Sequence, residues 1–265
     1  MTSRTLHGKN IFITGASGGI GAEIAWKCAE KGANLALFAR SLNKLEEIKR
    51  KLEEKFSAKV FVYELDVSDT DAVQKVFPLA LRDLKSIDVL VNNAGFGVFH
   101  EAHEATMTEI KGMFDVNVVG LMACTSAVLR LMREQRRGHI INIASQAGKI
   151  ATPKSSVYSA TKHAVIGYSN ALRMELLDYH VFVTTVNPGP IDTNFFTIAD
   201  EKGTYVKNVK RFMLKPKYVA KKVVDSMLTP TREINLPRWM SSGSIIYALF
   251  PRLFERLGKS VFNKK

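Results

Sequence analysis

Tyr158 and Lys162 are the residues whose types and spacing most directly suggest catalysis. They stand four residues apart in a helical pattern, so their side chains would share one face of the helix. A phenol with a pKa near 10 is a weak acid or base at neutral pH. A lysine cation about 4 Å away would favour the phenolate by roughly 4 kcal/mol, or about three pKa units, although burial would oppose this. The pair therefore predicts a tyrosine of lowered pKa that acts as a general acid or base.

Two other polar residues fit the same chemistry. Ser145 directly follows the apolar run His139–Ala144, which is typical of a buried strand. Its hydroxyl would hold a carbonyl oxygen next to Tyr158. Asn117 lies in the middle of the preceding helical pattern. There it would either bind a water molecule of a proton relay or serve as a packing amide.

A glycine-rich turn, Thr14-Gly-Ala-Ser-Gly-Gly-Ile-Gly21, joins the first predicted strand to the first predicted helix. Gly15, Gly19 and Gly21 lack a Cβ atom, so the backbone can approach a bulky anion at the positive end of that helix. The spacing departs from the G-x-G-x-x-G fingerprint. We expect the turn to hold a diphosphate and Ser17 to touch phosphate or ribose.

The same turn also satisfies the hydrolase pattern G-x-S-x-G, with Ser17 as the nucleophile. That nucleophile elbow normally needs earlier strands to supply an oxyanion hole. Because only one predicted strand precedes Ser17, hydrolysis is the less favoured interpretation.

Arg40 favours a particular nucleotide. It follows the second predicted strand, where dinucleotide-binding sheets often place a carboxylate for the ribose 2′-hydroxyl. A guanidinium suits a 2′-phosphate, so NADP(H) is favoured over NAD unless Arg40 is merely solvated. Asp66 ends the third strand and is expected to accept from the adenine amino group. Asn92-Asn-Ala-Gly95 ends the fourth strand, where it would either meet the ligand or form a structural turn.

Short apolar runs alternate with amphipathic stretches along the chain, which predicts a parallel sheet covered by helices on both faces. Six strands and a seventh, edge strand are expected at Asn10–Thr14, Asn34–Ala39, Lys59–Leu65, Asp88–Asn92, His139–Ala144, Val181–Asn187 and Glu233–Leu236. Helices are expected at Ile20–Lys31, Leu42–Phe56, from Ser68 as N-cap, at Thr108–Glu134, Val157–Asp178 and Tyr218–Leu228. The fold class is therefore α/β, a doubly wound, Rossmann-like sheet in a single domain. Phe195–Lys215 lacks a clear period and is expected to be a mobile loop.

In this order, over roughly residues 8–230, the motifs resemble the classical short-chain dehydrogenase/reductase family, in its NADP-preferring form. The resemblance implies reversible hydride transfer between NADP(H) and a carbonyl or secondary alcohol. It implies four catalytic residues: Asn117, Ser145, Tyr158 and Lys162. The implied cofactor-binding residues are Gly15, Ser17, Gly19, Ile20, Gly21, Arg40, Asp66, Val67, Asn93, Ala94, Gly95, Tyr158, Lys162, Pro188, Gly189, Ile191 and Thr193. Family members usually form dimers or tetramers through the two long helices, so a homo-oligomer is expected.

Composition excludes several other classes of protein. The 265 residues are 46% hydrophobic and 24% charged, which is ordinary for a globular protein and argues against disorder. The longest purely apolar runs fall far short of the roughly 20 residues of a membrane-spanning helix. The first strand begins too early for a secretory signal peptide. Cys28 and Cys124 are expected to be buried thiols in a cytoplasmic protein. His100 and His103 have an H-x-x-H spacing without a third ligand cluster, so no metal is expected.

Positive charge is concentrated near the C-terminus. The net charge of +13 divides into +1 for residues 1–201 and +12 for residues 202–265. Residues 1–240 are expected to form the dinucleotide-binding and catalytic domain, and 241–265 an amphipathic basic tail interrupted at Pro251. The tail would lie on an anionic membrane, pack on a partner subunit or cover the substrate cleft. A nucleic-acid role is not expected, because Arg133, Arg136 and Arg137 fit a helix C-terminus better.

The apolar tail, with Phe195 and Phe196, favours a hydrophobic carbonyl substrate. The alternative function is a nucleotide-binding or membrane-docked regulator without turnover.

Overall fold

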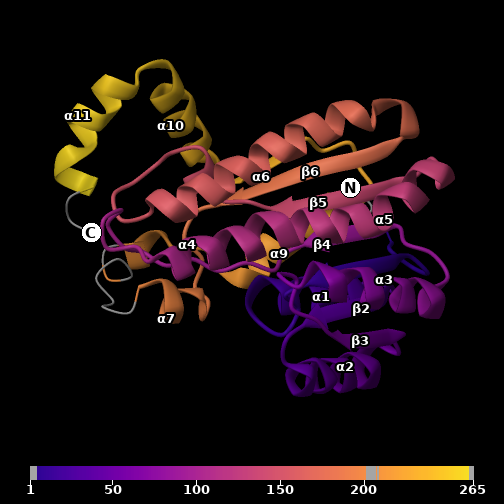
Figure 1. The fold of residues 1–265 in the computed structure, drawn as a ribbon. Helices are drawn as coiled ribbons and strands as arrows, with labels where there is room; N and C mark the ends of the chain where they lie inside the picture. The colour runs from indigo at the N-terminus through magenta and orange to yellow at the C-terminus, as the bar shows by residue number, and fades with distance from the viewer. Residues whose placement is uncertain (1–4, 201–206, 208, 263–265) are drawn as a thin grey trace.

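The computed structural model describes residues 5–200, 207 and 209–262 (Figure 1). Its centre is a seven-stranded parallel sheet with the strand order β3-β2-β1-β4-β5-β6-β7. The strands are β1 (Asn10–Thr14), β2 (Asn34–Ala39), β3 (Val60–Glu64), β4 (Val89–Asn92), β5 (Gly138–Ile143), β6 (Val181–Pro188) and β7 (Glu233–Leu236). The predicted doubly wound α/β fold is confirmed, and β7 is the edge strand that the sequence predicts.

Helices cover both faces of this sheet. The helices of the described chain are α1 (Gly19–Glu30), α2 (Leu42–Phe56), α3 (Thr70–Leu84), α4 (Met107–Phe114), α5 (Leu121–Gln135), α6 (Ser156–Glu175), α7 (Phe195–Ala199), α9 (Pro216–Asp225), α10 (Arg238–Leu249) and α11 (Pro251–Phe262). Core side chains of α1, α2 and α9 pack on one face, and those of α3, α5 and α6 on the other.

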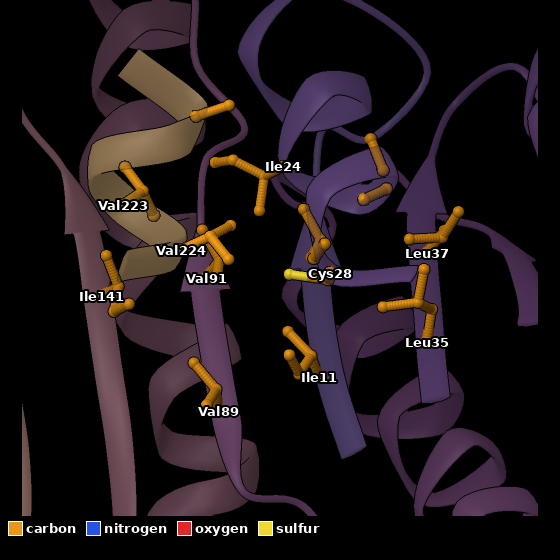
Figure 2. Close-up of a cluster of buried hydrophobic side chains, with 14 of the residues drawn as sticks. Ile11, Ile24, Cys28, Leu35, Leu37, Val89, Val91, Ile141, Val223 and Val224 are labelled. Atoms are coloured by element: carbon orange, nitrogen blue, oxygen red, sulfur yellow. The ribbon is translucent and has the colours of Figure 1, made fainter. Parts of the chain in front are cut away.

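Alternation along the strands builds two cores. Ile11 and Ile13 of β1 belong to the core under α1 and α9, whereas Phe12 between them belongs to the core under α3 and α5. Figure 2 shows the first core, in which Ile11 and neighbouring strand residues face Cys28 of α1 and Val223 of α9. Because both faces of each central strand are buried, most of the side chains in these strands are apolar. Cys28 and Cys124 are free and buried, as the sequence predicts.

The start of α3 and the course of the long helix after β4 differ from the predictions. The N-cap of α3 is Asp69, whose carboxylate accepts from the Ala72 N–H at 2.9 Å, and not Ser68. The Ser68 hydroxyl instead donates to Asp66. The single helix predicted at Thr108–Glu134 is interrupted by a π-helical turn, η1 (Asp115–Gly120), between α4 and α5.

The stretch Met107–Gln135 is, among the described residues, a helix long and apolar enough to cross a membrane by length and composition. Its apolar residues Cys124, Val128 and Met132 are buried against the sheet and α3. This packing accounts for its hydropathy as that of a core helix.

The predicted loop Phe195–Lys215 contains more regular structure than expected. It includes α7 and a short 3-10 turn, η4 (Lys210–Phe212), while 201–206 and 208 lie outside the described residues. The predicted tail forms α10 and α11, which meet at Pro251. Figure 1 shows this helix pair at the end of the molecule away from α2 and α3. Lys264 and Lys265 of the tail lie outside the described residues.

Candidate active site

The strand order places a topological switch between β1 and β4, because β1 pairs with β2 on one side and β4 on the other. Ligands of open α/β sheets bind outside the carboxyl ends of the strands at such a point. The Thr14 hydroxyl joins the two strand ends, because it accepts from the backbone N–H groups of Asn93 and Ala94, each at 3.1 Å.

A cavity of about 1020 Å³ runs along this edge. It is lined by the glycine-rich turn, the ends of β2 to β6, α6 and the C-terminal helices. Of the predicted site residues, those in the lining are Gly15, Ser17, Gly19, Ile20, Arg40, Asp66, Val67, Asn93, Ala94, Gly95, Ser145, Tyr158, Lys162, Pro188, Gly189, Ile191 and Thr193. Gly21 and Asn117 lie behind this lining.

Two glycines of the turn, Gly15 and Gly21, are required by close packing. Gly15 has φ +64°, and a Cβ atom there would lie 2.8 Å from the Ala94 Cα atom. A Cβ atom on Gly21 would lie 2.4 Å from the Gly15 carbonyl oxygen. The Asn93 amide donates to the carbonyl oxygens of Thr14 and Gly15, each at 3.0 Å. The turn is therefore held tightly against the end of β4.

The N-terminus of α1 opens on the cavity. Its N-cap, Gly18, has no side chain to accept from the first N–H groups of the helix, and its first turn contains no acidic residue. Gly18, Gly19 and Ile20 all line the cavity. Free N–H groups and a positive helix end suit a diphosphate, so this part of the cavity fits a dinucleotide.

The far end of the cavity, near β2 and β3, carries cations and one carboxylate. Arg40 is exposed at the end of β2, and Lys44 follows one turn later in α2; both line the cavity. The Asp66 carboxylate is fixed by Ser68, whose N–H and hydroxyl donate to it at 3.0 and 2.7 Å. Lys44 was not predicted from the sequence, although its place in the first turn of the helix after Arg40 is a usable signal.

At the other end, Tyr158 and Lys162 of α6 lie beside Ser145, which follows β5. The Lys162 Nζ atom lies 5.7 Å from the centre of the Tyr158 ring and donates to the Ile143 carbonyl oxygen at 3.0 Å. The Ser145 hydroxyl accepts from the Ala147 N–H at 3.0 Å, which fixes its position at the N-terminus of the 3-10 turn η2 (Gln146–Gly148).

The predicted lowering of the tyrosine pKa is wrong for this structure. Burial raises the pKa of Tyr158 to about 12, and the hydrogen bond with Ser145 offsets only part of this. Burial also lowers the pKa of Lys162 to about 8. The lysine cation is directed at the Ile143 carbonyl, so desolvation outweighs its attraction for the phenolate. Tyr158 is therefore a protonated phenol at neutral pH, which suits an acid.

Asn117 lies on the π-helical turn η1 and is buried. Its amide oxygen accepts from the Phe96 N–H at 3.0 Å, and its amide nitrogen donates to the Phe96 carbonyl at 2.8 Å and to Thr161 at 3.1 Å. These contacts tie the loop after β4 to α6. These hydrogen bonds hold the Asn117 amide in place, and its catalytic role stays a prediction.

Aromatic rings form a wall next to Tyr158. The Tyr158 ring centre lies 5.9 Å from that of Phe99 and 5.7 Å from that of Phe195. Phe196 lies 6.2 Å from Phe99, and all four rings line the cavity. The space in front of Tyr158 is thus largely apolar.

A buried polar network beneath the site was not predicted. The Asn92 amide donates to Thr125 and Asn142, each at 2.9 Å, and Asn142 donates to Ser169 at 2.8 Å. The network connects β4, β5, α5 and α6, so it fixes the helices that carry the site. The sequence signal that could have indicated this network is Asn142, a polar residue inside an apolar strand pattern.

Ser17 lines the cavity, but the described residues of the lining include no histidine to act as its base. The two histidines of the H-x-x-H spacing each lie beside a carboxylate. His100 lies 3.4 Å from Glu109, and His103 lies 3.7 Å from Glu101. Within the described residues, no group of three or more His, Cys, Asp or Glu side chains is placed to hold a metal ion.

Comparison with known proteins identifies the family. The family model described as short chain dehydrogenase matches residues 9–203. The NADP-dependent 3-hydroxy acid dehydrogenase of Schizosaccharomyces pombe is 36% identical over 195 residues, covering 73% of this chain and 75% of the relative. An alcohol dehydrogenase from Thermococcus sibiricus, solved in complex with 5-hydroxy-NADP, is 30% identical with a TM-score of 0.78 and coverage of 86% of this chain and 95% of that one.

A short-chain dehydrogenase/reductase from Burkholderia phymatum, solved in complex with NAD, has a TM-score of 0.87 at 24% identity, over 94% of this chain and 96% of that one. At that identity the likeness concerns the fold alone. The matched family model covers most of the chain. It includes the glycine-rich turn, the switch point between β1 and β4, and Tyr158 with Lys162. The chain therefore belongs to the short-chain dehydrogenase/reductase family of oxidoreductases.

Proposed function

We propose that the protein is an NADP(H)-dependent oxidoreductase that interconverts a hydrophobic ketone or aldehyde and the corresponding alcohol. The observation that carries the proposal is the position of Tyr158, Ser145 and Lys162 in the same cavity as the uncapped N-terminus of α1. A pure nucleotide sensor needs no proton donor, so the regulatory alternative is not favoured.

Ser145, Tyr158 and Lys162 each have a separate role in the proposed reaction. A bound nicotinamide cofactor would supply or accept the hydride. The Ser145 hydroxyl holds the carbonyl oxygen of the substrate, and the Tyr158 phenol donates its proton to that oxygen as negative charge develops there. Lys162 supplies a buried cation beside the phenol and would contact the nicotinamide ribose. Since an alkoxide is more basic than a phenolate, a phenol with a raised pKa remains an effective donor in the direction of reduction.

The choice of NADP(H) rests on two cations. Arg40 and Lys44 lie at the end of the cavity where a 2′-phosphate would bind, and Arg40 can contact it through two N–H groups. A relative named NADP-dependent and a similar structure solved with an NADP derivative support this choice. The wall formed by Phe99, Phe195 and Phe196 favours an apolar group next to the carbonyl.

A screen of carbonyl compounds and alcohols tests the proposal. Absorbance of the reduced cofactor would be followed with NADPH and with NADH in parallel. We expect consumption of NADPH with apolar ketones or aldehydes and weaker reaction with NADH. Tight NADPH binding without turnover across a broad panel would contradict the enzymatic function, and a preference for NADH would contradict the role of Arg40 and Lys44.

A further inference from the structure

The two C-terminal helices expose an apolar surface that lies largely outside the cavity. More than half of each side chain in this surface is exposed. We call it the C-terminal apolar face, and it consists of Phe212, Trp239, Ile245, Ile246, Leu249, Phe250 and Leu253. Such a concentration of large exposed apolar residues marks an interaction site.

The opposite side of the same helices packs on the protein. Met240, Gly243 and Phe254 line the cavity, and Ser244 is buried. A Cβ atom on Gly189 would lie 2.9 Å from the Met240 sulfur, so α10 rests closely on the segment after β6. One side of α10 therefore covers the cavity, as one of the sequence-based alternatives predicts, and the other side is left for a different contact.

The elements that carry the apolar face also expose cations. Arg238, Arg252 and Arg256 are exposed on α10 and α11, and Lys210 and Arg211 are exposed directly before Phe212. Residues 202–265 carry 15 Lys and Arg against 3 Asp and Glu. A second copy of the chain seated here would bring two strongly positive regions together, which is unfavourable. Nucleic acid would match the charge but not the exposed aliphatic side chains.

We propose that the C-terminal apolar face docks on an anionic membrane surface. Its aliphatic and aromatic side chains would enter the boundary between headgroups and acyl chains, while the surrounding arginines and lysines contact lipid phosphates. Phe212 and Trp239 contact each other, with ring centres 6.4 Å apart, and both also line the cavity. The docked face thus borders the cavity, and, if the proposed function holds, a lipid-dissolved carbonyl compound could enter there.

Vesicle flotation tests the proposal without relying on enzymatic activity. The full-length protein would be mixed with phosphatidylcholine vesicles that either contain or lack phosphatidylglycerol. We expect flotation with the anionic vesicles, weakened by added salt, and little with phosphatidylcholine alone. The sequence contains two tryptophans, Trp26 and Trp239. In a Trp26→Phe variant, emission from Trp239 should therefore shift to shorter wavelength on binding to the anionic vesicles.

Matched variants locate the contact. Leu249→Glu, on the apolar face, should weaken vesicle binding roughly tenfold or more, and Arg252→Glu with Arg256→Glu should do the same. The controls are Leu79→Glu on α3, and Arg50→Glu with Lys75→Glu on α2 and α3, which change exposed residues at the other end of the molecule. Circular dichroism and NADPH binding would show that each variant is folded.

Three results would overturn the proposal. One is equal binding to vesicles with and without phosphatidylglycerol. Another is an equal loss of binding in the control variants. The third is an absence of flotation together with a change of oligomeric state in Leu249→Glu, which would make this face a contact between copies of the chain.

Discussion

Arg40 and Lys44 are the residues that we propose distinguish the two nicotinamide cofactors. Both line the end of the cavity near β2. Charge-assisted hydrogen bonds to a phosphate contribute about 1.5–3 kcal/mol each. Arg40→Ala should therefore raise the KM for NADPH by roughly 10- to 100-fold and change the KM for NADH little. Steady-state kinetics with both cofactors measures this. Arg50→Ala, on α2 and outside the cavity lining, is the control, and a similar loss with NADH would contradict the assignment.

Gly21 is expected to be intolerant of any side chain. A Cβ atom there would lie 2.4 Å from the Gly15 carbonyl oxygen, which is backbone and cannot move without reshaping the turn. We expect Gly21→Ala to lower the free energy of unfolding by about 1–3 kcal/mol. Urea denaturation gives this value. Gly18→Ala provides the matched control, because a Cβ atom on Gly18 would have nothing within 4 Å. Equal stability of the two variants would contradict the packing argument.

Tyr158 and Lys162 show where residue-level reasoning from the sequence succeeded and where it failed. The helical spacing predicted that the two side chains share a face, and the structure places both in the cavity lining. The predicted pKa direction was wrong because Coulomb attraction was weighed without the actual burial and the actual partner of the lysine, the Ile143 carbonyl. The burial of the site and the hydrogen-bond partner of Lys162 both depend on segments that are distant in the sequence.

At the scale of elements, the strands were predictable because each buried strand is a short, mainly apolar run whose alternate residues enter the two cores on opposite faces of the sheet. The π-helical turn at Asp115–Gly120 was not, since local sequence does not specify an i→i+5 pattern. The structure places this turn directly against the segment after β3, where a Cβ atom on Gly120 would lie 2.5 Å from the Val67 carbonyl oxygen.

His139 on β5 links three elements and predicts a pH dependence of stability. Its Nδ1 atom accepts from the Leu228 N–H at 2.9 Å, so Nε2 carries the proton and donates to Thr184 at 2.8 Å. Burial lowers the pKa of His139 from 6.5 to about 3. Between these two pKa values, the unfolded chain binds a proton at His139 and the folded chain does not. The contribution of His139 to stability is therefore present above about pH 6.5 and is lost as the pH falls.

This histidine should lower the free energy of unfolding by about 1.4 kcal/mol for each pH unit below 6.5. Denaturant titrations between pH 8 and pH 5 measure the slope. His139→Gln should be less stable at pH 8, since the Leu228 N–H loses its acceptor, but it should lack this component of the slope. An identical pH slope in the two proteins would show that the imidazole does not titrate between the folded and unfolded states.

On the scale of the whole molecule, the fold brings the switch point, the Tyr158 region and the C-terminal helices around one cavity. The doubly wound topology could be predicted from the order of strands and helices. The division into residues 1–240 and a tail remains a prediction, although α10 and α11 contribute to the cavity lining. The sequence did not indicate which side of the tail faces the protein, because that depends on how α10 rests on the segment after β6.

The predicted homo-oligomer can be tested on the long helices. Val119 lies on η1 directly before α5, Met174 lies on α6 and Leu177 directly after it, and these residues are exposed by 43%, 74% and 69%. Analytical ultracentrifugation should detect a dimer or tetramer, and Met174→Glu with Leu177→Glu should shift it toward smaller species. A monomer at micromolar concentration would contradict the expectation.

The proposed reaction depends most on the proton that we assign to Tyr158. Tyr158→Phe removes the hydroxyl and keeps the ring that packs on Phe99 and Phe195. With a ketone identified in the screen, single-turnover oxidation of NADPH should slow by at least about 100-fold, while the Kd for NADPH changes little. An unchanged rate in this variant would contradict the role of Tyr158 as the proton donor.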